Sequence, residues 1–383
     1  MKIPRTRFLG AAVAALALAV GATGFAAVGQ PPLHSAAATS TKPDLSSARG
    51  AKVLVDTDFG QLNDDSQMLY ELTQAHADVL GVTTVSGNVW SQEATAYALR
   101  QLQLVHQTRV PVLQGAADPI GGSRQHKLGR EARFYGKVGY VGAWDHSEPA
   151  GYRNLAERPY RGYSSTPRTK GSAPDFIARQ IKAHPHQVTL FVLGPATNVA
   201  RAVQRHPEIV PLVKQVVYMG GAYSVPGNEG PASEFNVWFD PVAAKIALNT
   251  PFPDAMIVPL DVTDTVHYGK AQYDRIVSGR RPTPITQEFR DLQGPTFAHD
   301  PGYTTYVYDA LTAAIFLQPS LITKSHVAKV QVDTHYAVDF GHTLAYPPSA
   351  APHGTATARI VTRIDVPAFF SLYVHLMTAP VTT

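Results

Sequence analysis

The sequence predicts an α/β protein: an open, mainly parallel, Rossmann-like sheet flanked by helices, in a single domain. Three observations lead to this prediction. Short apolar runs rich in β-branched residues alternate with longer amphipathic stretches over residues 52–260. Several of the apolar runs lead directly into polar or glycine-rich loops, as strands of parallel sheets do at their ligand-binding ends. The chain shows neither an internal repeat nor an interdomain linker.

The apolar runs predict buried strands at residues 52–56, 79–85, 110–113, 188–193, 213–219 and 255–260. Helical periodicity predicts helices at residues 65–74, 92–105, 173–183, 198–206 and 241–248. Since most of these helical segments lie between two strands, the pattern is βαβ and the sheet is expected to be mainly parallel.

Two regions interrupt the alternation. Residues 121–169 are rich in Gly, Arg, Tyr and Ser and predict a long surface insertion. Residues 346–355 are rich in Pro and Ala and predict a loop between two strand-like stretches near the C-terminus.

The N-terminus has the pattern of a secretory signal peptide. Residues 1–27 contain three basic residues and no acidic one, then an apolar stretch at 8–20, then small residues. The apolar stretch is short, and the chain has no cysteine for lipidation, so no stable membrane anchor is expected. We predict secretion, a flexible lead-in at 28–50 with a second processing point at 36–38, and a catalytic domain at 51–383.

Charge and cysteine content narrow the classes of function. Removing residues 1–27 lowers the formal net charge from +4 to about +1, so binding of nucleic acid by bulk charge is not expected. A secreted chain without cysteine has no disulfides, and its stability must come from a large core. The sequence leaves the oligomeric state open, a homo-oligomer included.

The most informative stretch is the exit of the first predicted strand, where Asp56, Asp58, Asp64 and Asp65 fall within ten residues. Carboxylates this close repel one another, and a hard, oxygen-seeking cation would offset the repulsion. The alternative is a solvated acidic loop that only caps the helix beginning near Ser66.

Further polar loops are expected at the same edge of the sheet. Residues 86–88, 194–198 and 219–221 each follow a predicted strand, and parallel strands present their carboxyl ends at one rim. The segment 227–241 adds several amide and carboxylate side chains, which can fork to vicinal hydroxyls as recognition of a polyol requires.

Taken in order, these motifs resemble the calcium-dependent nucleoside hydrolases of the inosine-uridine preferring type, in a secreted, bacterial-like form. The resemblance covers about residues 52–320 and depends on the order and spacing of all the motifs together. It implies the nucleoside hydrolase fold, a small nucleoside as substrate, and hydrolysis of the N-glycosidic bond of ribonucleosides to free base and ribose.

The resemblance also implies a ligand set. Ca²⁺ would be held by Asp58, Asp65, the carbonyl of Thr197 and a late carboxylate, for which Asp309 is preferred to Asp300 because it begins an apolar helical register. Asp58 would also take the proton of the attacking water.

For the substrate, the resemblance implies contacts of Asp64 with the 2′-hydroxyl and of Asn236 with the 3′-hydroxyl. Asn228 and Glu234 would meet the 5′-hydroxyl, and Asn88 would contact the sugar. As single residues beside glycines, Asn88 and Asn228 are equally well explained as turn residues.

The chain departs from the family pattern at two points. Residues 59–63 make the gap between the base and the Asp pair longer than in the short form of the motif. The leaving-group acid is also altered, because the preferred register puts Tyr308 where relatives often carry histidine, while His299 fits only if Asp300 is the metal ligand. An ordinary tyrosine is a weak acid at neutral pH, which puts purine preference in doubt.

Two other functions remain open at this point. One is hydrolysis of another N-ribosyl or glycosidic substrate on the same scaffold. The other is a non-catalytic extracellular protein that binds nucleosides or sugars. A base carboxylate beside a metal favours chemistry over binding alone.

Overall fold

The computed structural model describes residues 45–136 and 139–382 of the chain. The predicted signal peptide and most of the predicted lead-in lie outside these residues. None of the helices in the described part of the chain combines the length and apolarity needed to cross a bilayer.

In the described residues, nine strands form one sheet in the order β10-β9-β11-β6-β5-β4-β1-β2-β3, and β7 and β8 form a separate ribbon. The strands are β1 (Lys52–Thr57), β2 (Asp78–Thr84), β3 (Val112–Gln114), β4 (Thr189–Val192), β5 (Gln215–Met219), β6 (Ala255–Val258), β7 (His267–Gly269), β8 (Thr304–Tyr306), β9 (Ile322–Val332), β10 (Thr343–Tyr346) and β11 (Ala356–Ile364). The six predicted strands are β1 to β6, each within two residues of its expected ends.

All neighbouring strands from β3 across the sheet to β11 pair in parallel, including β1 with β2 and β1 with β4. Within the nine-stranded sheet of the described residues, β9 alone pairs antiparallel with its neighbours, β10 and β11, and the separate ribbon of β7 and β8 is also antiparallel. The loop predicted at 346–355 joins β10 to β11, as expected. The prediction of an open, mainly parallel sheet is confirmed.

The α-helices are α1 (Asp64–Gln74), α2 (Ser91–Leu104), α3 (Leu128–Tyr135), α4 (Ala173–Ala183), α5 (Thr197–Arg205), α6 (Phe235–Phe239), α7 (Pro241–Leu248), α8 (Leu260–Thr263), α9 (Lys270–Val277), α10 (Pro284–His299), α11 (Tyr308–Leu317) and α12 (Val366–Thr378). The five predicted helices are α1, α2, α4, α5 and α7, each correct to within one residue. Short 3₁₀ turns lie at Gln125–Lys127, Gly142–Asp145, Pro207–Leu212, Pro319–Leu321 and Pro348–Ala350.

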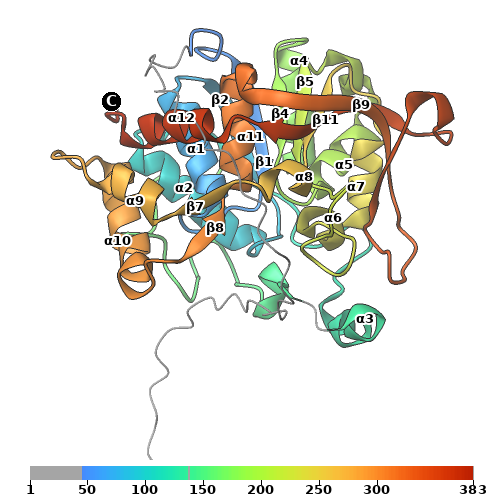
Figure 1. Cartoon of the computed structure of the whole chain (residues 1–383), viewed down its shortest axis with the longest axis horizontal. Coiled ribbons are helices and arrows are strands. Elements are labelled where there is room, and N and C mark those ends of the chain that lie inside the picture. Colours follow the sequence, from blue (N-terminus) through green and yellow to red (C-terminus); the bar gives the residue numbers. More distant parts are fainter. Residues whose placement is uncertain (1–44, 137–138, 383) are drawn as a thin grey trace, which may run out of the picture. The chain divides into compact units, whose positions relative to one another are not determined.

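Both faces of the sheet are covered, because side chains alternate along each strand. In β1, Val53 and Val55 join the core formed with α1, α2, α11 and α12, whereas Leu54 joins the core formed with α4, α5 and α7. Figure 1 shows these two sets of helices on opposite sides of the central strands. A sheet buried on both faces explains why the predicted strands are continuously apolar.

The segment 121–169 is more than a surface insertion, which corrects the sequence-based expectation. It contains α3 and two 3₁₀ turns, and Ala143 and Trp144 within it are almost fully buried. They pack with Phe235, Trp238 and Phe239 of α6 in a third, aromatic core. Phe235 and Trp238 are both buried in this core.

A buried polar network joins α1, α2 and α10. The hydroxyl oxygen of Tyr70 lies within hydrogen-bonding distance of Oε1 of Gln101, at 2.9 Å, and of Oε2 of Glu288, at 2.5 Å. The amide of Gln101 donates to Oε1 of Glu288 at 3.1 Å and to Oγ of Ser66 at 3.2 Å. Ser66 Oγ in turn donates to the carbonyl of Gly60 at 3.0 Å, in the loop that carries the acidic cluster.

Glu288→Gln is expected to make the free energy of unfolding fall less as the pH rises from 5 to 8. Burial raises the pKa of Glu288 to about 7, so the folded protein keeps a proton that the unfolded chain releases near pH 4.5. The resulting stabilisation is complete below pH 4.5 and is lost as the pH rises through 7. Denaturant unfolding at pH 5 and pH 8 gives this fall for each protein. In Glu288→Gln it should be smaller than in the native protein by an amount on the order of 2 kcal/mol. An unchanged difference would contradict an uncharged Glu288.

Candidate active site

The site begins where β1 ends and α1 starts. Asp58 follows the strand and is fully buried, and its Oδ2 accepts a hydrogen bond from the backbone N–H of Asn88 at 2.5 Å. Asn63 begins α1 as its N-cap, with its side-chain oxygen accepting from the N–H of Ser66. The first turn of α1 therefore places Asp64 and Asp65 beside the strand exit.

Asp65 is held by neutral donors from both sides. Its carboxylate accepts from the hydroxyl of Thr57 and from the side-chain amide of Asn63. The side-chain amide of Asn88 lies 3.5 Å from its Oδ2. These contacts fix the carboxylate without supplying a positive charge.

Asp309, the preferred candidate for the late carboxylate, lies in the first turn of α11. One carboxylate oxygen from each of Asp64, Asp65 and Asp309 lies within 4.8 Å of the others, and the N–H of Asp309 donates to Oδ2 of Asp64 at 3.2 Å. The N-cap of α11 is Val307, so Asp309 is not the cap of its helix. Asp300 is exposed, and its Oδ1 accepts from the N–H of Gly302 two residues later.

The electrostatics of this cluster favour a cation. Among the described residues, Oδ1 of Asp58 and Oδ1 of Asp309 are buried without a hydrogen-bond partner. Burial, followed by the neighbouring charge of Asp65, raises the pKa of Asp58 well above its usual range and that of Asp64 to about 7. The pKa of Asp309 is raised well above its usual range by burial and then by Asp65.

All the side-chain groups in the cluster are oxygen donors, the ligand type of a hard cation such as calcium. The two unpartnered buried oxygens and the mutual repulsion indicate that the residues fit such an ion. Asp64, for which the resemblance implied a contact with the 2′-hydroxyl of the substrate, belongs to the same cluster.

The loop after β4 brings Thr197 to the N-terminus of α5, and both Thr197 and Asn198 are buried. The hydroxyl of Thr197 donates to Oδ2 of Asp240 at 2.7 Å. The amide of Asn198 donates to Oδ1 of Asp56 at 2.8 Å. Asp56 and Asp240 therefore hold Asn198 and Thr197 in place at the carboxyl end of the sheet.

Asn236 and Glu234 lie at the start of α6. The Asn236 amide donates to the carbonyl of Leu193 at 2.7 Å. Glu234 is the N-cap and accepts from the N–H groups of Asn236, Val237 and Gly221. Burial raises the pKa of Glu234 to about 7. Any contact of Glu234 with substrate would have to share oxygens that already bind three backbone donors.

The two candidates for the leaving-group acid differ in setting. Tyr308 is half-buried beside Asp309; its ring stacks on Tyr306 at 5.1 Å and its hydroxyl bonds to Asn228. Burial raises the pKa of Tyr308 above its ordinary value. His299 is exposed at the C-terminal end of α10, outside the three-carboxylate cluster.

Close backbone contacts position Asp58. A Cβ on Gly87 would lie 2.0 Å from Oδ2 of Asp58, and one on Gly194 would lie 2.6 Å from its Oδ1. Gly142, at φ +53°, approaches Gly87 from the outside, and a Cβ there would lie 2.1 Å from the Gly87 carbonyl oxygen. Gly87 and Gly194 thus allow two segments to approach the Asp58 carboxylate, and Gly142 allows a third segment to pack on Gly87.

Gly87→Ala is expected to lower turnover at least a hundredfold, because the methyl group would push Asp58 out of position. Overpacking of this kind also costs roughly 1–3 kcal/mol of stability. Steady-state kinetics and thermal unfolding should be compared with Gly121→Ala, where a Cβ meets nothing within 4 Å. Equal activity of the two variants would contradict the role given to this contact.

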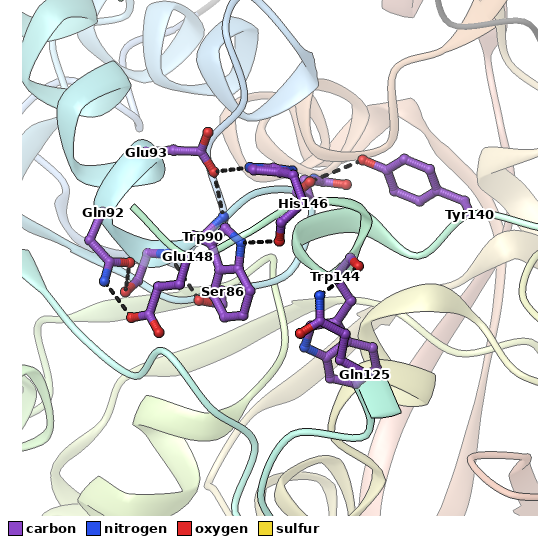
Figure 2. A network of polar contacts seen from close by, with 11 residues as sticks. Ser86, Trp90, Gln92, Glu93, Gln125, Tyr140, Trp144, His146 and Glu148 are labelled. Carbon is purple, nitrogen blue, oxygen red and sulfur yellow. Dashed lines mark hydrogen bonds and ion pairs between the residues drawn. The ribbon is translucent and has the colours of Figure 1, made fainter. Parts of the chain in front are cut away.

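A segment that sequence analysis did not identify holds the Asn88 loop in place. The hydroxyl of Tyr140 donates to the carbonyl of Asn88 at 3.2 Å. The indole N–H of Trp90 donates to the carbonyl of His146, whose Nε2 lies 2.9 Å from Oε2 of Glu93 (Figure 2). Nothing in local spacing marks these contacts, because they join segments far apart in the chain.

A cluster of carboxylates that could hold a hard cation therefore lies at the exit of a parallel strand of an α/β sheet. Comparison with known proteins identifies the family. Residues 53–371 match the inosine-uridine preferring nucleoside hydrolase family, and the chain belongs to it. It is therefore an N-glycosidase, and the alternative of a non-catalytic binding protein is set aside.

Curated relatives agree with this assignment. The chain is 30% identical to uridine nucleosidase 1 of Arabidopsis thaliana, over 76% of this chain and 81% of the relative. It is 31% identical to a pyrimidine-specific ribonucleoside hydrolase of Shewanella baltica, over 76% of this chain and 85% of the relative.

Solved structures support the fold. A plant nucleoside hydrolase superposes with a TM-score of 0.71 at 24% identity, covering 86% of this chain and all of the other. The inosine-uridine preferring nucleoside hydrolase of Bacillus anthracis gives 0.65 at 20% identity, covering 85% and 99%.

Proposed function

We propose that the protein is a secreted, calcium-dependent ribonucleoside hydrolase that prefers pyrimidine nucleosides, with uridine as the leading substrate. The proposal of a metal ion rests on the cluster of Asp64, Asp65 and Asp309 beside Asp58. Two buried carboxylate oxygens there, Oδ1 of Asp58 and Oδ1 of Asp309, lack a hydrogen-bond partner. The names of the relatives from Arabidopsis and Shewanella support the choice of base.

Asp58, Asp65, Asp309 and the carbonyl of Thr197 would hold the calcium, with Asp64 adjoining it. Bound there, calcium would acidify a water molecule and orient ribose hydroxyls. Asp58 is the base: the N–H of Asn88 holds its carboxylate through Oδ2, and the carboxylate would accept a proton from the attacking water. The water oxygen adds to C1′ as the N-glycosidic bond breaks. The nucleobase leaves as an anion, which takes up a proton from solvent, and Asp58 returns the proton of the attacking water to solvent.

Tyr308 favours a pyrimidine as leaving group. With its pKa raised by burial, this tyrosine donates a hydrogen bond but does not readily give up its proton near neutral pH. Uracil departs as an anion whose charge is spread over its carbonyl oxygens, so a hydrogen bond at its edge is sufficient help. A purine that must be protonated on its ring gains less.

Tyr308→Phe is expected to lower kcat for uridine about tenfold, the effect of losing one hydrogen bond to a charged group. Loss of a true general acid would cost a hundredfold or more. Steady-state kinetics on uridine and inosine would show which applies, with His299→Ala as the control for the other candidate. A larger effect of His299→Ala would assign the acid to His299.

The proposed function is tested by incubating the protein with uridine, cytidine, inosine and adenosine in phosphate-free buffer, with and without a calcium chelator. Released base and free ribose are measured by chromatography. Hydrolysis fastest on uridine, abolished by chelation and restored by calcium, is expected. Full activity after chelation would contradict the metal, and faster hydrolysis of inosine would contradict the base preference.

Secretion rests on the charge and apolar pattern of residues 1–27. Expression of the full chain in a secreting host should place the protein in the medium. N-terminal sequencing should then begin near residue 28, or after residue 38 if the second processing point is used. Recovery only inside the cells with an intact N-terminus would contradict secretion.

A further inference from the structure

A cavity of about 400 Å³ lies apart from the acidic cluster. It is formed by the last turns of α2, the loop around residue 161 and the first turn of α10. Arg100, His106 and Arg161 line it, and none of the described residues that line it carries a carboxylate. This cavity therefore has the opposite electrostatic character to the active site.

The two arginines are held by contacts that leave most of their donors available. Nε of Arg100 donates to the carbonyl of Tyr160 at 2.7 Å. The guanidinium of Arg161 lies 4.9 Å from the centre of the Tyr160 ring and 3.4 Å from Oδ2 of Asp291. Oδ2 of Asp291 also accepts from the Tyr160 hydroxyl at 2.5 Å, and Oδ1 accepts from Gln287. Because Asp291 is shared among these donors, it neutralises the charge of Arg161 only in part.

Neutral groups in the cavity add to the donors. Gln103 uses its side-chain oxygen to accept from the N–H of Ser165, which leaves its amide hydrogens for another partner. Thr283 also lines the cavity, and the exposed Arg280 and Arg281 lie directly before it in the chain. A ligand that satisfies these groups needs several acceptor oxygens and negative charge.

We propose that this cavity binds a small anion bearing a phosphate group. Guanidinium groups match the oxygens of phosphate in geometry and charge, and a cation would find no ligand carboxylate on the cavity wall. The reaction class that supplies free nucleosides, hydrolysis of nucleotide phosphomonoesters, releases inorganic phosphate alongside them. Inorganic phosphate and a sugar phosphate are the two sources of this chemistry.

The test is calorimetric titration of the full protein at constant ionic strength, with inorganic phosphate in one arm and ribose 5-phosphate in the other. Saturable one-to-one binding is expected, and Arg100→Gln and Arg161→Gln should each weaken it about tenfold. The matched control is Arg359→Gln, an exposed arginine on β11 that lies outside the cavity lining. Thermal unfolding checks that each variant folds. Arg100→Gln loses the hydrogen bond to the Tyr160 carbonyl; if this destabilises that variant, Arg161→Gln still tests the site.

Tighter binding of inorganic phosphate would identify the free ion, and tighter binding of ribose 5-phosphate would identify a sugar phosphate; both support the site. Three results would overturn it. These are an absence of saturable binding to either probe, binding that both cavity substitutions leave unchanged, and equal weakening by Arg359→Gln, which would indicate a general effect of charge.

Discussion

Asp58→Asn is expected to lower kcat for uridine by about three orders of magnitude, within the range for loss of a general base. An amide keeps the shape of the side chain and can still accept from the N–H of Asn88, but it cannot take a proton from water. Because the substitution removes a buried charge that Asp65 repels, the metal-free protein should lose no stability. Single-turnover kinetics and thermal unfolding measure the two effects.

The matched control is Asp56→Asn, two residues earlier on the same strand. Asp56 is equally buried, but its Oδ1 contacts Thr83 and Asn198, behind the rim of the site. We expect this variant to lose less than tenfold in kcat. An Asp58→Asn enzyme within tenfold of the native rate would show that another group accepts the proton.

Asp309→Ala is expected to weaken calcium binding at least a hundredfold while leaving the metal-free protein as stable as before, or more stable. The physical reason is that Asp309 is buried among Asp58, Asp64 and Asp65, which destabilise its charged form. Removing one member of this group relieves repulsion but removes a ligand. Calorimetric titration with calcium and thermal unfolding with and without calcium measure both consequences.

Asp300→Ala provides the control, since Asp300 is exposed and caps a turn. It should bind calcium normally. A purely structural Asp309 would behave differently: its removal would cost about 1 kcal/mol in the metal-free protein, as loss of a helix cap does, and calcium binding would persist. If Asp300→Ala lost calcium instead, the register of the late ligand would be shifted.

Much of the fold could be predicted from local pattern. The runs around Val55 and Val217 are apolar on both faces because both faces of a parallel sheet are buried, so these strands were recognised. The acidic cluster could also be placed, since Asp58 and Asp65 border the end of the first strand and the start of the first helix. The link to Asp309 followed from the register of an apolar helix.

Contacts between distant segments could not be predicted in this way. The hydroxyl of Tyr140 meets the Asn88 loop through a segment whose sequence suggested only a surface insertion. Likewise, Glu288 is a carboxylate on an amphipathic helix, and only the structure shows that it faces Tyr70 and Gln101 instead of solvent. A single sequence fixes neither the pairing of such segments nor the partners of a buried polar group.

The order of strands has a consequence for how the protein avoids self-association. Any sheet with open borders offers unpaired backbone groups on which another chain can add a strand. Here the borders are β3 and β10, of three and four residues, and β10 pairs with only the last four residues of the eleven-residue strand β9, 329–332. Within the described residues, 322–328 of β9 have no strand partner on that side. The exposed charged side chain of Lys324 in this stretch opposes the addition of a strand from another chain.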